Sequence, residues 1–186
     1  QSVKKGVKQS GGTPREFCTI TVTDGIAMGH EGMKSSLISR EVIADSAELT
    51  VRGHCYDALV GIAGCDKSLP GLMMSMLRLN VPSVFIYGGS ILPGKFKGKD
   101  VTVVDVFEAV GKHSSGKMSS EELRELELVA CPSAGACGGQ FTANTMACVS
   151  EAIGLALPYS AGTPAPYEER DKYAYESGQA VMNLLE

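Results

Sequence analysis

The sequence has no apolar run that approaches the ~20 residues needed to cross a bilayer. Its first residues, Gln-Ser-Val-Lys-Lys, also lack the apolar core of a secretion signal. Positive charge is not in excess, since the net charge is -4. This charge argues against a broad surface for binding nucleic acid. Internal repeats and low-complexity linkers are absent as well. We therefore expect no membrane and no nucleic-acid partner, and a cytoplasmic location, or an organelle matrix if the source is eukaryotic.

The composition is that of an ordinary globular protein. Apolar residues make up 44% of the chain and charged residues 20%, which places the sequence outside the disordered class. A chain of 186 residues is long enough for one sizeable domain that buries roughly 70% of the surface of its unfolded chain. We expect residues 1–186 to form a single α/β domain or part of one.

Six cysteines are scattered through apolar segments rather than set in a small loop-rich scaffold. Because intracellular thiols are normally reduced, they are left for packing, metal ligation or catalysis. Cys18, Cys55 and Cys148 lie inside expected strands or helices, which favours a structural role. Cys65 and Cys137 differ from these three because glycine adjoins each of them.

Hydrophobic patterns that alternate between strand and helix predict an α/β fold. Strands are expected at residues 17–22, 56–63 and 83–87, and helices at 33–51, 72–79, 103–110, 119–129, 141–157 and 171–185. This order favours right-handed crossovers and a largely parallel sheet flanked by helices. Residues 91–100 are expected to form an exposed connection.

The helix expected at residues 33–51 is amphipathic. Its pattern predicts a buried face made of Leu37, Ile38, Val42, Ile43, Ala47 and Leu49. Charged residues are available for the solvent face, namely Arg40, Glu41, Asp45 and Glu48.

Chemically reactive residues follow the expected strands. Folds of this class place ligands beyond the carboxyl ends of their strands, where Asp24, Cys65 and the Gly88-Gly89 pair occur. Next to Cys65 stand Asp66 and Lys67, so a soft thiolate and a hard carboxylate adjoin. We expect the corner of a metal site here. The alternative is a buried structural cysteine beside a surface ion pair.

A second cysteine-bearing loop precedes the helix expected at residues 141–157. Cys131 and Cys137 are in this glycine-rich loop, where backbone NH groups and the helix dipole favour a thiolate or another anion. The alternative is a helix entry whose cysteines only pack. Their spacing does not match a zinc knuckle.

Hard ligands are available in the loop of residues 24–32. Asp24 and Glu31 are the stronger candidates for a hard cation, whereas His30 is expected to order the loop. The loop could also be only a turn. Lys67 has two interpretations, an ordinary ammonium that neutralises carboxylates or a desolvated amine that reacts with carbon dioxide to give a carbamate ligand.

Four motifs together resemble the dihydroxy-acid dehydratase family, which includes phosphogluconate and sugar-acid dehydratases. They are DGIAMGH at residues 24–30, SREVIADS at 39–46, GCDK at 64–67 and CGGQFTANTM at 137–146. The motifs are long, rich in unusual residues and spread over nearly the whole chain.

The resemblance implies an iron–sulfur and magnesium dependent lyase. Such an enzyme removes water from a 2,3-dihydroxy carboxylate to give a 2-keto acid in branched-chain amino-acid biosynthesis. Cys65 and Cys137 match the cysteines that bind the cluster, for which we expect the 2Fe-2S type. Asp24 and Asp66 match magnesium ligands, and Lys67 matches the position that is carbamylated and also binds magnesium. Glu31 gains no role.

The resemblance also implies an incomplete site. Family members are several times longer, with a further cluster cysteine before this segment and a serine base and another magnesium ligand after it. We therefore expect an amino-terminal domain fragment of a larger two-domain enzyme that is inactive alone, carries no catalytic residue of its own and forms a homo-oligomer at full length. The alternatives are a sugar-acid or phosphogluconate dehydratase and a non-catalytic metal-binding module.

Overall fold

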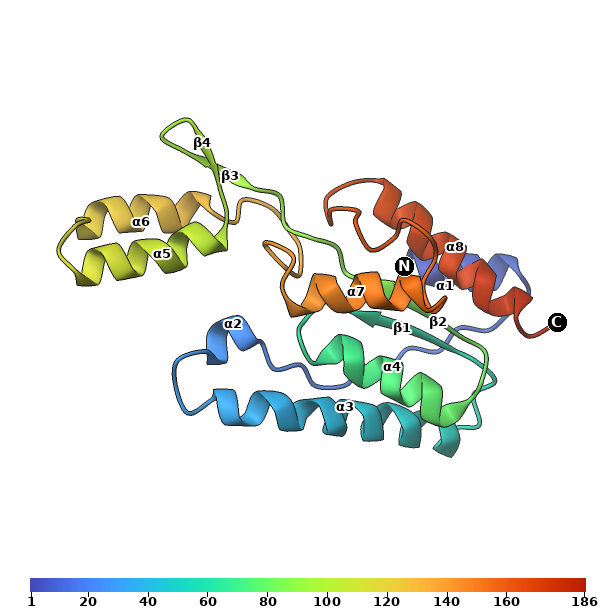
Figure 1. Ribbon diagram of the computed structural model, residues 1–186. Coiled ribbons are helices and arrows are strands. Elements are labelled where there is room, and N and C mark those ends of the chain that lie inside the picture. The colour runs from blue at the N-terminus through green and yellow to red at the C-terminus, as the bar shows by residue number, and fades with distance from the viewer.

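The chain is described by a computed structural model that covers residues 1–186. Its elements, in chain order, are α1 (Ser2–Gln9), α2 (Asp24–Ala27), α3 (Met33–Gly53), β1 (Leu59–Ala63), α4 (Ser68–Leu79), β2 (Ser83–Tyr87), β3 (Gly94–Phe96), β4 (Lys99–Val101), α5 (Val103–Ser114), α6 (Ser120–Val129), α7 (Thr142–Ala152) and α8 (Glu169–Asn183). The predicted α/β class is confirmed, because β1 and β2 pair in parallel between helices (Figure 1). The parallel sheet is small, with two strands.

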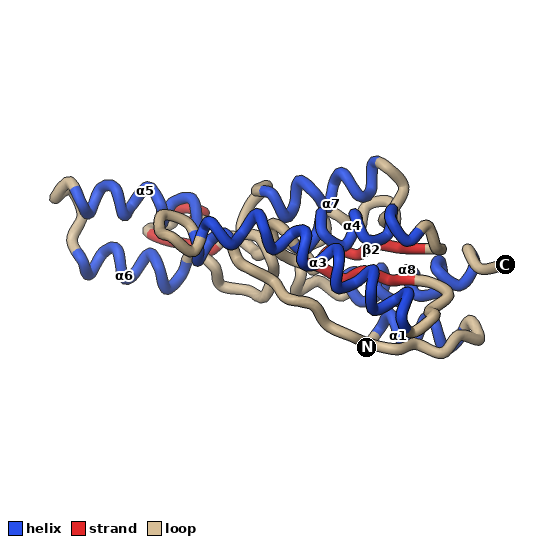
Figure 2. Tube along the Cα trace, turned by 90° about the horizontal axis from the view of Figure 1, so that it is seen from below, coloured by secondary structure: helices blue, strands red, loops and turns tan.

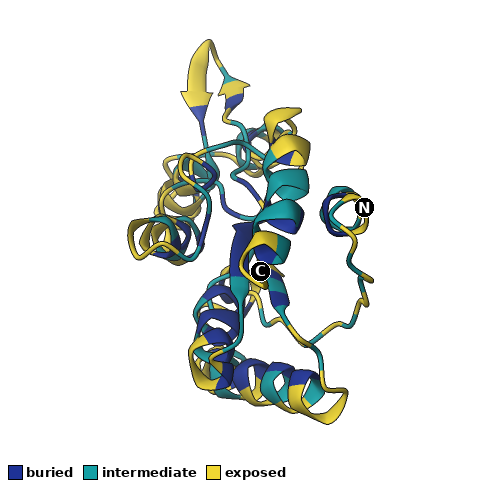
Figure 3. Ribbon diagram, turned by 90° about the vertical axis from the view of Figure 1, so that its right-hand side faces the viewer, coloured by how far each residue is buried: buried dark blue, intermediate teal, exposed yellow.

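Helices cover both faces of the parallel pair. α4 and α7 pack on one face, with α3 outside α4, and α8 packs on the other, with α1 beside α8 (Figures 1 and 2). Strand residues alternate between faces, so Phe85 and Tyr87 join the main core while Val84 packs with Val181 of α8. Buried residues accordingly follow the strands and the inward sides of the helices (Figure 3).

A smaller unit projects from this body. It contains the antiparallel β3–β4 hairpin and the helices α5 and α6 (Figure 1). Its own core has four buried residues, Val101, Ala109, Leu126 and Ala130. Thr102 caps α5 in a capping box with Asp105, and Ser119 caps α6.

The strand predicted at residues 17–22 is wrong. These residues belong to no helix or strand, and none of their backbone groups takes part in a backbone–backbone hydrogen bond. The β-branched composition favours extended backbone, but a strand also needs a partner. Asp24, which was expected in a loop, is the first residue of the short helix α2.

The predicted buried face of α3 is only partly right. Ile43 and Ala47 are fully buried, but Leu37, Ile38, Val42 and Leu49 are exposed. The buried face is completed by small residues, Ser36, Ser39 and Ala44, together with Val51. Small side chains allow close approach to α4, where Gly71 lies against Ile43 and the carbonyl of Arg40. The close approach of α4 therefore decided which face of α3 is buried, and the hydrophobicity of the α3 side chains did not.

Other differences concern boundaries. The stretch at residues 91–100 contains the β3–β4 hairpin, whose turn residues Lys97 and Gly98 both have positive φ, as a two-residue hairpin turn of type I′ requires. α7 ends at Ala152, earlier than predicted, and α1 was not predicted. No helix is long and apolar enough to cross a membrane.

Candidate metal centre

Cys65 sits in the turn between β1 and α4. Its carbonyl accepts hydrogen bonds from the backbone NH groups of Ser68 and Leu69. The Ser68 hydroxyl also donates to this carbonyl, at 2.8 Å, and accepts from the Cys65 NH, at 3.1 Å. The start of α4 thus fixes the Cys65 backbone at the carboxyl end of β1.

The loop that carries Cys137 is joined to the segment that follows β2. The Ala136 NH donates to the Gly89 carbonyl and the Ile91 NH donates to the Cys137 carbonyl, both at 2.8 Å. Gly89 has a φ of +93°, and a Cβ there would meet the backbone of Ala165. Only glycine suits this position.

The same loop packs against the Cys65 turn. A Cβ placed on Gly64 would lie 2.8 Å from the Cβ of Ala136, so the residues that precede the two cysteines are in close contact. The loops after β1 and β2 therefore meet at this end of the sheet, and the loop of Cys137 joins them. Cys131, in contrast, is exposed.

Both cysteines are free thiols that donate hydrogen bonds. The Cys65 Sγ donates to Asp66 Oδ2 at 3.3 Å, and the buried Cys137 Sγ donates to the Gly139 carbonyl at 2.9 Å. Burial is the main cause that raises the pKa of the Cys65 thiol; a hydrogen bond with Thr23 opposes the rise and the Asp66 carboxylate adds to it. Binding a metal here would therefore release protons.

Asp24 and Lys67 form a largely buried ion pair. Lys67 Nζ lies 2.6 Å from Asp24 Oδ2, and the Ser36 hydroxyl donates to the other carboxylate oxygen. Asp24 is only 7% exposed. In this structure Lys67 therefore acts as an ammonium group that neutralises a carboxylate, the first of its two interpretations. The carboxylate belongs to a residue 43 positions away in the sequence.

The five predicted site residues divide into subsets. Asp24 pairs with Lys67, and Asp66 is hydrogen-bonded to Cys65, while Cys137 lies in the adjoining loop. No group of three or more histidine, cysteine, aspartate or glutamate side chains is gathered closely enough to hold a metal ion. These residues thus meet at one edge of the sheet without forming a closed coordination shell.

The remaining candidates of the 24–32 loop do not join the site. Glu31 pairs with Lys34 at an exposed position. The His30 ring accepts from the Gly32 NH through Nδ1 and donates from Nε2 to the Ile26 carbonyl. His30 therefore orders its own loop, as predicted.

Two side chains at this edge were missed by sequence reasoning. Ser36, in the first turn of α3, donates a hydrogen bond to Asp24. No local sequence pattern indicates this role. Tyr87 is the last residue of β2 and is 1% exposed, yet its hydroxyl has no hydrogen-bond partner. Burial, followed by the negative charge available at Cys137, raises its pKa, while the Asn144 side chain and the Arg170 charge oppose the rise. Its place directly before Gly88-Gly89, at the end of a buried strand, was a usable signal.

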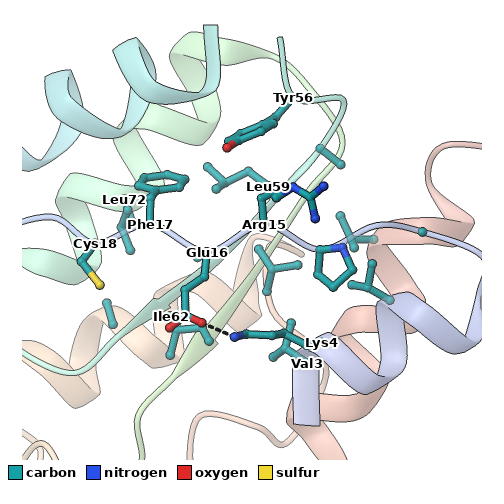
Figure 4. Close-up of a pocket in the computed structure, with 18 of the residues that line it drawn as sticks. Val3, Lys4, Arg15, Glu16, Phe17, Cys18, Tyr56, Leu59, Ile62 and Leu72 are labelled. Atoms are coloured by element: carbon teal, nitrogen blue, oxygen red, sulfur yellow. Dashed lines mark ion pairs between the residues drawn. The ribbon is translucent and has the colours of Figure 1, made fainter. Parts of the chain in front are cut away.

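A further groove lies away from this edge of the sheet. It has a volume of about 640 Å³ and is bounded by residues 12–19, β1, and the ends of α1 and α8 (Figure 4). Phe17 and Tyr56 line it, and a Lys4–Glu16 ion pair lies within it. None of the five predicted site residues lines this groove.

Comparison with known proteins gives a consistent result. Residues 1–186 match the family model "Dihydroxy-acid/6-phosphogluconate dehydratase N-terminal". The chain is 91% identical over 186 residues to a dihydroxy-acid dehydratase of Pelagibacter ubique. The match covers 100% of this chain and 32% of that relative. It is 84% identical over 185 residues to a dihydroxy-acid dehydratase of Parvibaculum lavamentivorans, and this match covers 100% of the chain and 32% of the relative. A third, from Sulfurisphaera tokodaii, is 58% identical over 184 residues, with 99% and 33% covered. The chain thus spans about a third of the length of these relatives.

Proposed function

Because the chain belongs to the dihydroxy-acid/6-phosphogluconate dehydratase family, we propose that it is the amino-terminal α/β part of a hydro-lyase. The complete enzyme would remove water from a branched 2,3-dihydroxy carboxylate and release a 2-keto acid for branched-chain amino-acid biosynthesis. The relatives bear the name dihydroxy-acid dehydratase. The observation that carries the proposal is the meeting of free thiols and carboxylates at one edge of the parallel sheet.

The thiol side of this edge fits an iron–sulfur cluster. Cys65 and Cys137 are unpaired by disulfides and lie in loops that pack against one another. Thiolates are the ligands that such clusters use. The Tyr87 hydroxyl has no partner among the protein atoms. In the proposal Cys65 and Cys137 supply two cluster ligands, and the others come from residues outside 1–186.

The carboxylate side fits magnesium under one condition. Asp24 and Asp66 offer the oxygen ligands that magnesium prefers, but the Lys67 ammonium already neutralises Asp24. A cation and an ammonium would repel each other at this carboxylate. Carbamylation removes the conflict, because the neutral amine adds to carbon dioxide, one proton leaves, and an anionic oxygen ligand replaces the ammonium. We propose this state for the loaded enzyme.

The reaction needs no net oxidation. Loss of the proton at C2 and of the hydroxyl at C3 gives an enol, which tautomerises to the 2-keto acid, so that one water leaves. When bound, the two metal groups would supply Lewis acidity for the leaving hydroxyl and for the substrate carboxylate. The carboxylate end of the substrate would be oriented by the magnesium side of the site, which contains Asp24, Asp66 and Lys67. The hydroxyl end would be oriented by the cluster side, which contains Cys65 and Cys137. The base lies outside these residues.

The complete enzyme is proposed to be a homo-oligomer. Exposed apolar side chains on the neighbouring helices α2 and α3, among them Ile26, Leu37 and Ile38, support burial against a further segment or chain. Light scattering of the full-length protein measures its oligomeric state.

The proposal is tested on full-length protein purified without oxygen. Iron, sulfide and magnesium are quantified, and keto-acid release is followed with a branched 2,3-dihydroxy carboxylate, a sugar acid and a phosphogluconate. We expect all three inorganic components and turnover of the branched substrate. Cys65→Ser should lose iron and activity together, whereas Cys18→Ser, at an exposed cysteine, should keep both.

Each contrary outcome has a distinct meaning. Absence of both iron and magnesium would overturn the dehydratase mechanism. Faster turnover of a sugar acid or phosphogluconate would move the assignment to that branch of the family. Full activity of Cys65→Ser would remove Cys65 from the cluster.

A further inference from the structure

Tyr87 carries a buried polar group with no partner. The residue is 1% exposed and its hydroxyl makes no hydrogen bond in the protein. A buried hydroxyl without a partner keeps its desolvation cost without compensation, and tyrosine normally finds a partner for its hydroxyl when buried. An unpaired hydroxyl inside a core therefore indicates a missing acceptor.

The position of Tyr87 shows where that acceptor belongs. Tyr87 pairs with Ala63 across the parallel sheet, two residues before Cys65. On its other side, the segment after β2 is hydrogen-bonded to the loop of Cys137, and Tyr87 shares the main core with Cys137. The backbone on either side of Tyr87 is therefore joined to the loops that carry the two cysteines.

A buried cation lies against the same ring. The Arg170 guanidinium is 5.9 Å from the centre of the Tyr87 ring and is 8% exposed. It donates to the Ser160 carbonyl, but no carboxylate pairs with it among the ion pairs of the chain. Buried charges are usually paired. An anionic group at the cysteines would compensate this charge as well.

We propose that Tyr87 is a positioning residue whose hydroxyl donates a hydrogen bond to sulfur of the cluster that Cys65 and Cys137 hold. This inference rests on the proposed function and adds a residue to it. Tyr87 contacts neither the substrate nor the magnesium ligands in this assignment. Its role is to satisfy negative charge on sulfur within a buried site.

The physical consequence is measurable without turnover. Hydrogen bonds to cluster sulfur stabilise the more negative, reduced state, so the reduction potential rises with each bond. Partners beyond the direct ligands also strengthen metal retention. Loss of the Tyr87 hydroxyl should therefore lower the reduction potential and shorten the lifetime of the cluster in air. In protein without the cluster, the same change removes an unpaired buried group and should raise stability.

The experiment uses full-length protein that carries Tyr87→Phe, with Tyr159→Phe as the matched control. Tyr159 is 79% exposed, so its hydroxyl is solvated. Reduction potential is measured by spectroelectrochemistry, cluster loss in air by visible absorbance, and stability of cluster-free protein by urea unfolding. We expect Tyr87→Phe to show a lower potential, several-fold faster cluster loss and a higher urea midpoint without the cluster. Tyr159→Phe should match the wild type in all three.

The outcomes separate this inference from the proposed function. If the wild type carries no cluster, both fail together. If the wild type carries one and Tyr87→Phe leaves potential and lifetime unchanged, the inference alone is overturned, and a water molecule is the partner of the hydroxyl instead. A lower urea midpoint for cluster-free Tyr87→Phe would also contradict it, because the hydroxyl would then have a partner in the protein itself.

Discussion

At the residue scale, Asp24 connects the two halves of the candidate site. It lies after the extended segment of residues 12–23, yet it binds Lys67 beyond β1 and Ser36 in α3. Asp24 is 7% exposed in the protein, and its carboxylate accepts two hydrogen bonds. A buried carboxylate of this kind depends on its partners, because an unpaired buried charge is costly.

Asp24→Asn should therefore destabilise the protein even without metal. The substitution leaves the Lys67 ammonium without its carboxylate, and a hydrogen bond to a charged group contributes about 1.5–3 kcal/mol. We expect a loss of about that size in the free energy of unfolding, measured with urea on metal-free protein. Asp57→Asn is the control, because Asp57 is exposed and forms no ion pair. Equal stability of the two variants would contradict a structural role for the Asp24–Lys67 pair.

At the element scale, the helices α1 and α8 pack through glycine. A Cβ on Gly6 would meet the carbonyl oxygen of Tyr175 well inside contact distance, and a Cβ on Gly178 would meet that of Val3. Both glycines are buried inside helices, where glycine is otherwise unfavourable. The benefit of close packing between the two helices outweighs that cost.

Gly6→Ala and Gly111→Ala should have effects of opposite sign. At Gly6 the added methyl forces α1 away from α8, and overpacking of this kind costs about 1–3 kcal/mol. At Gly111, in α5, no atom lies within 4 Å of the added methyl, so helix propensity should stabilise the protein by about 1 kcal/mol. Urea unfolding measures both. Destabilisation by both variants would contradict the packing argument.

At the scale of the whole molecule, the core is divided. The main cluster of 17 buried residues joins α3, α4, α7 and the parallel strands. The four-residue cluster of α5, α6 and β4 is separate, and the unit projects from the body (Figure 1). Few buried apolar contacts give a region of low local stability.

Amides of α5 and α6 should exchange with solvent deuterium faster than those of α4 and β2. The small core of the projecting unit permits local opening without unfolding of the main cluster. Hydrogen exchange with mass spectrometry measures both regions in one sample. Leu126→Ala, in the four-residue core, should speed exchange in α5 and α6 and leave α4 unchanged. Equal protection of both regions would mean that the two cores unfold as one.

Local patterns predicted many of the elements. β2 matches its prediction at both ends, and α6 matches its predicted range to within one residue. The errors occur where a distant partner decides. Residues 17–22 have strand composition but no strand beside them, and α3 buries serines where Leu37 and Leu49 were expected. Neither the pairing nor the close approach of α4 can be read from the local sequence.

The sequence by itself determined which chemical groups are available and which strand ends carry them. Cys65, Asp66 and Lys67 are adjacent in the chain, so their place after β1 followed from periodicity alone. Only the tertiary structure decided how the distant groups are paired, with Lys67 on Asp24 and the buried Tyr87 hydroxyl left without a partner. The reason is physical: contacts between residues far apart in sequence depend on which elements pack together, and burial makes each polar group depend on the partner that packing brings to it.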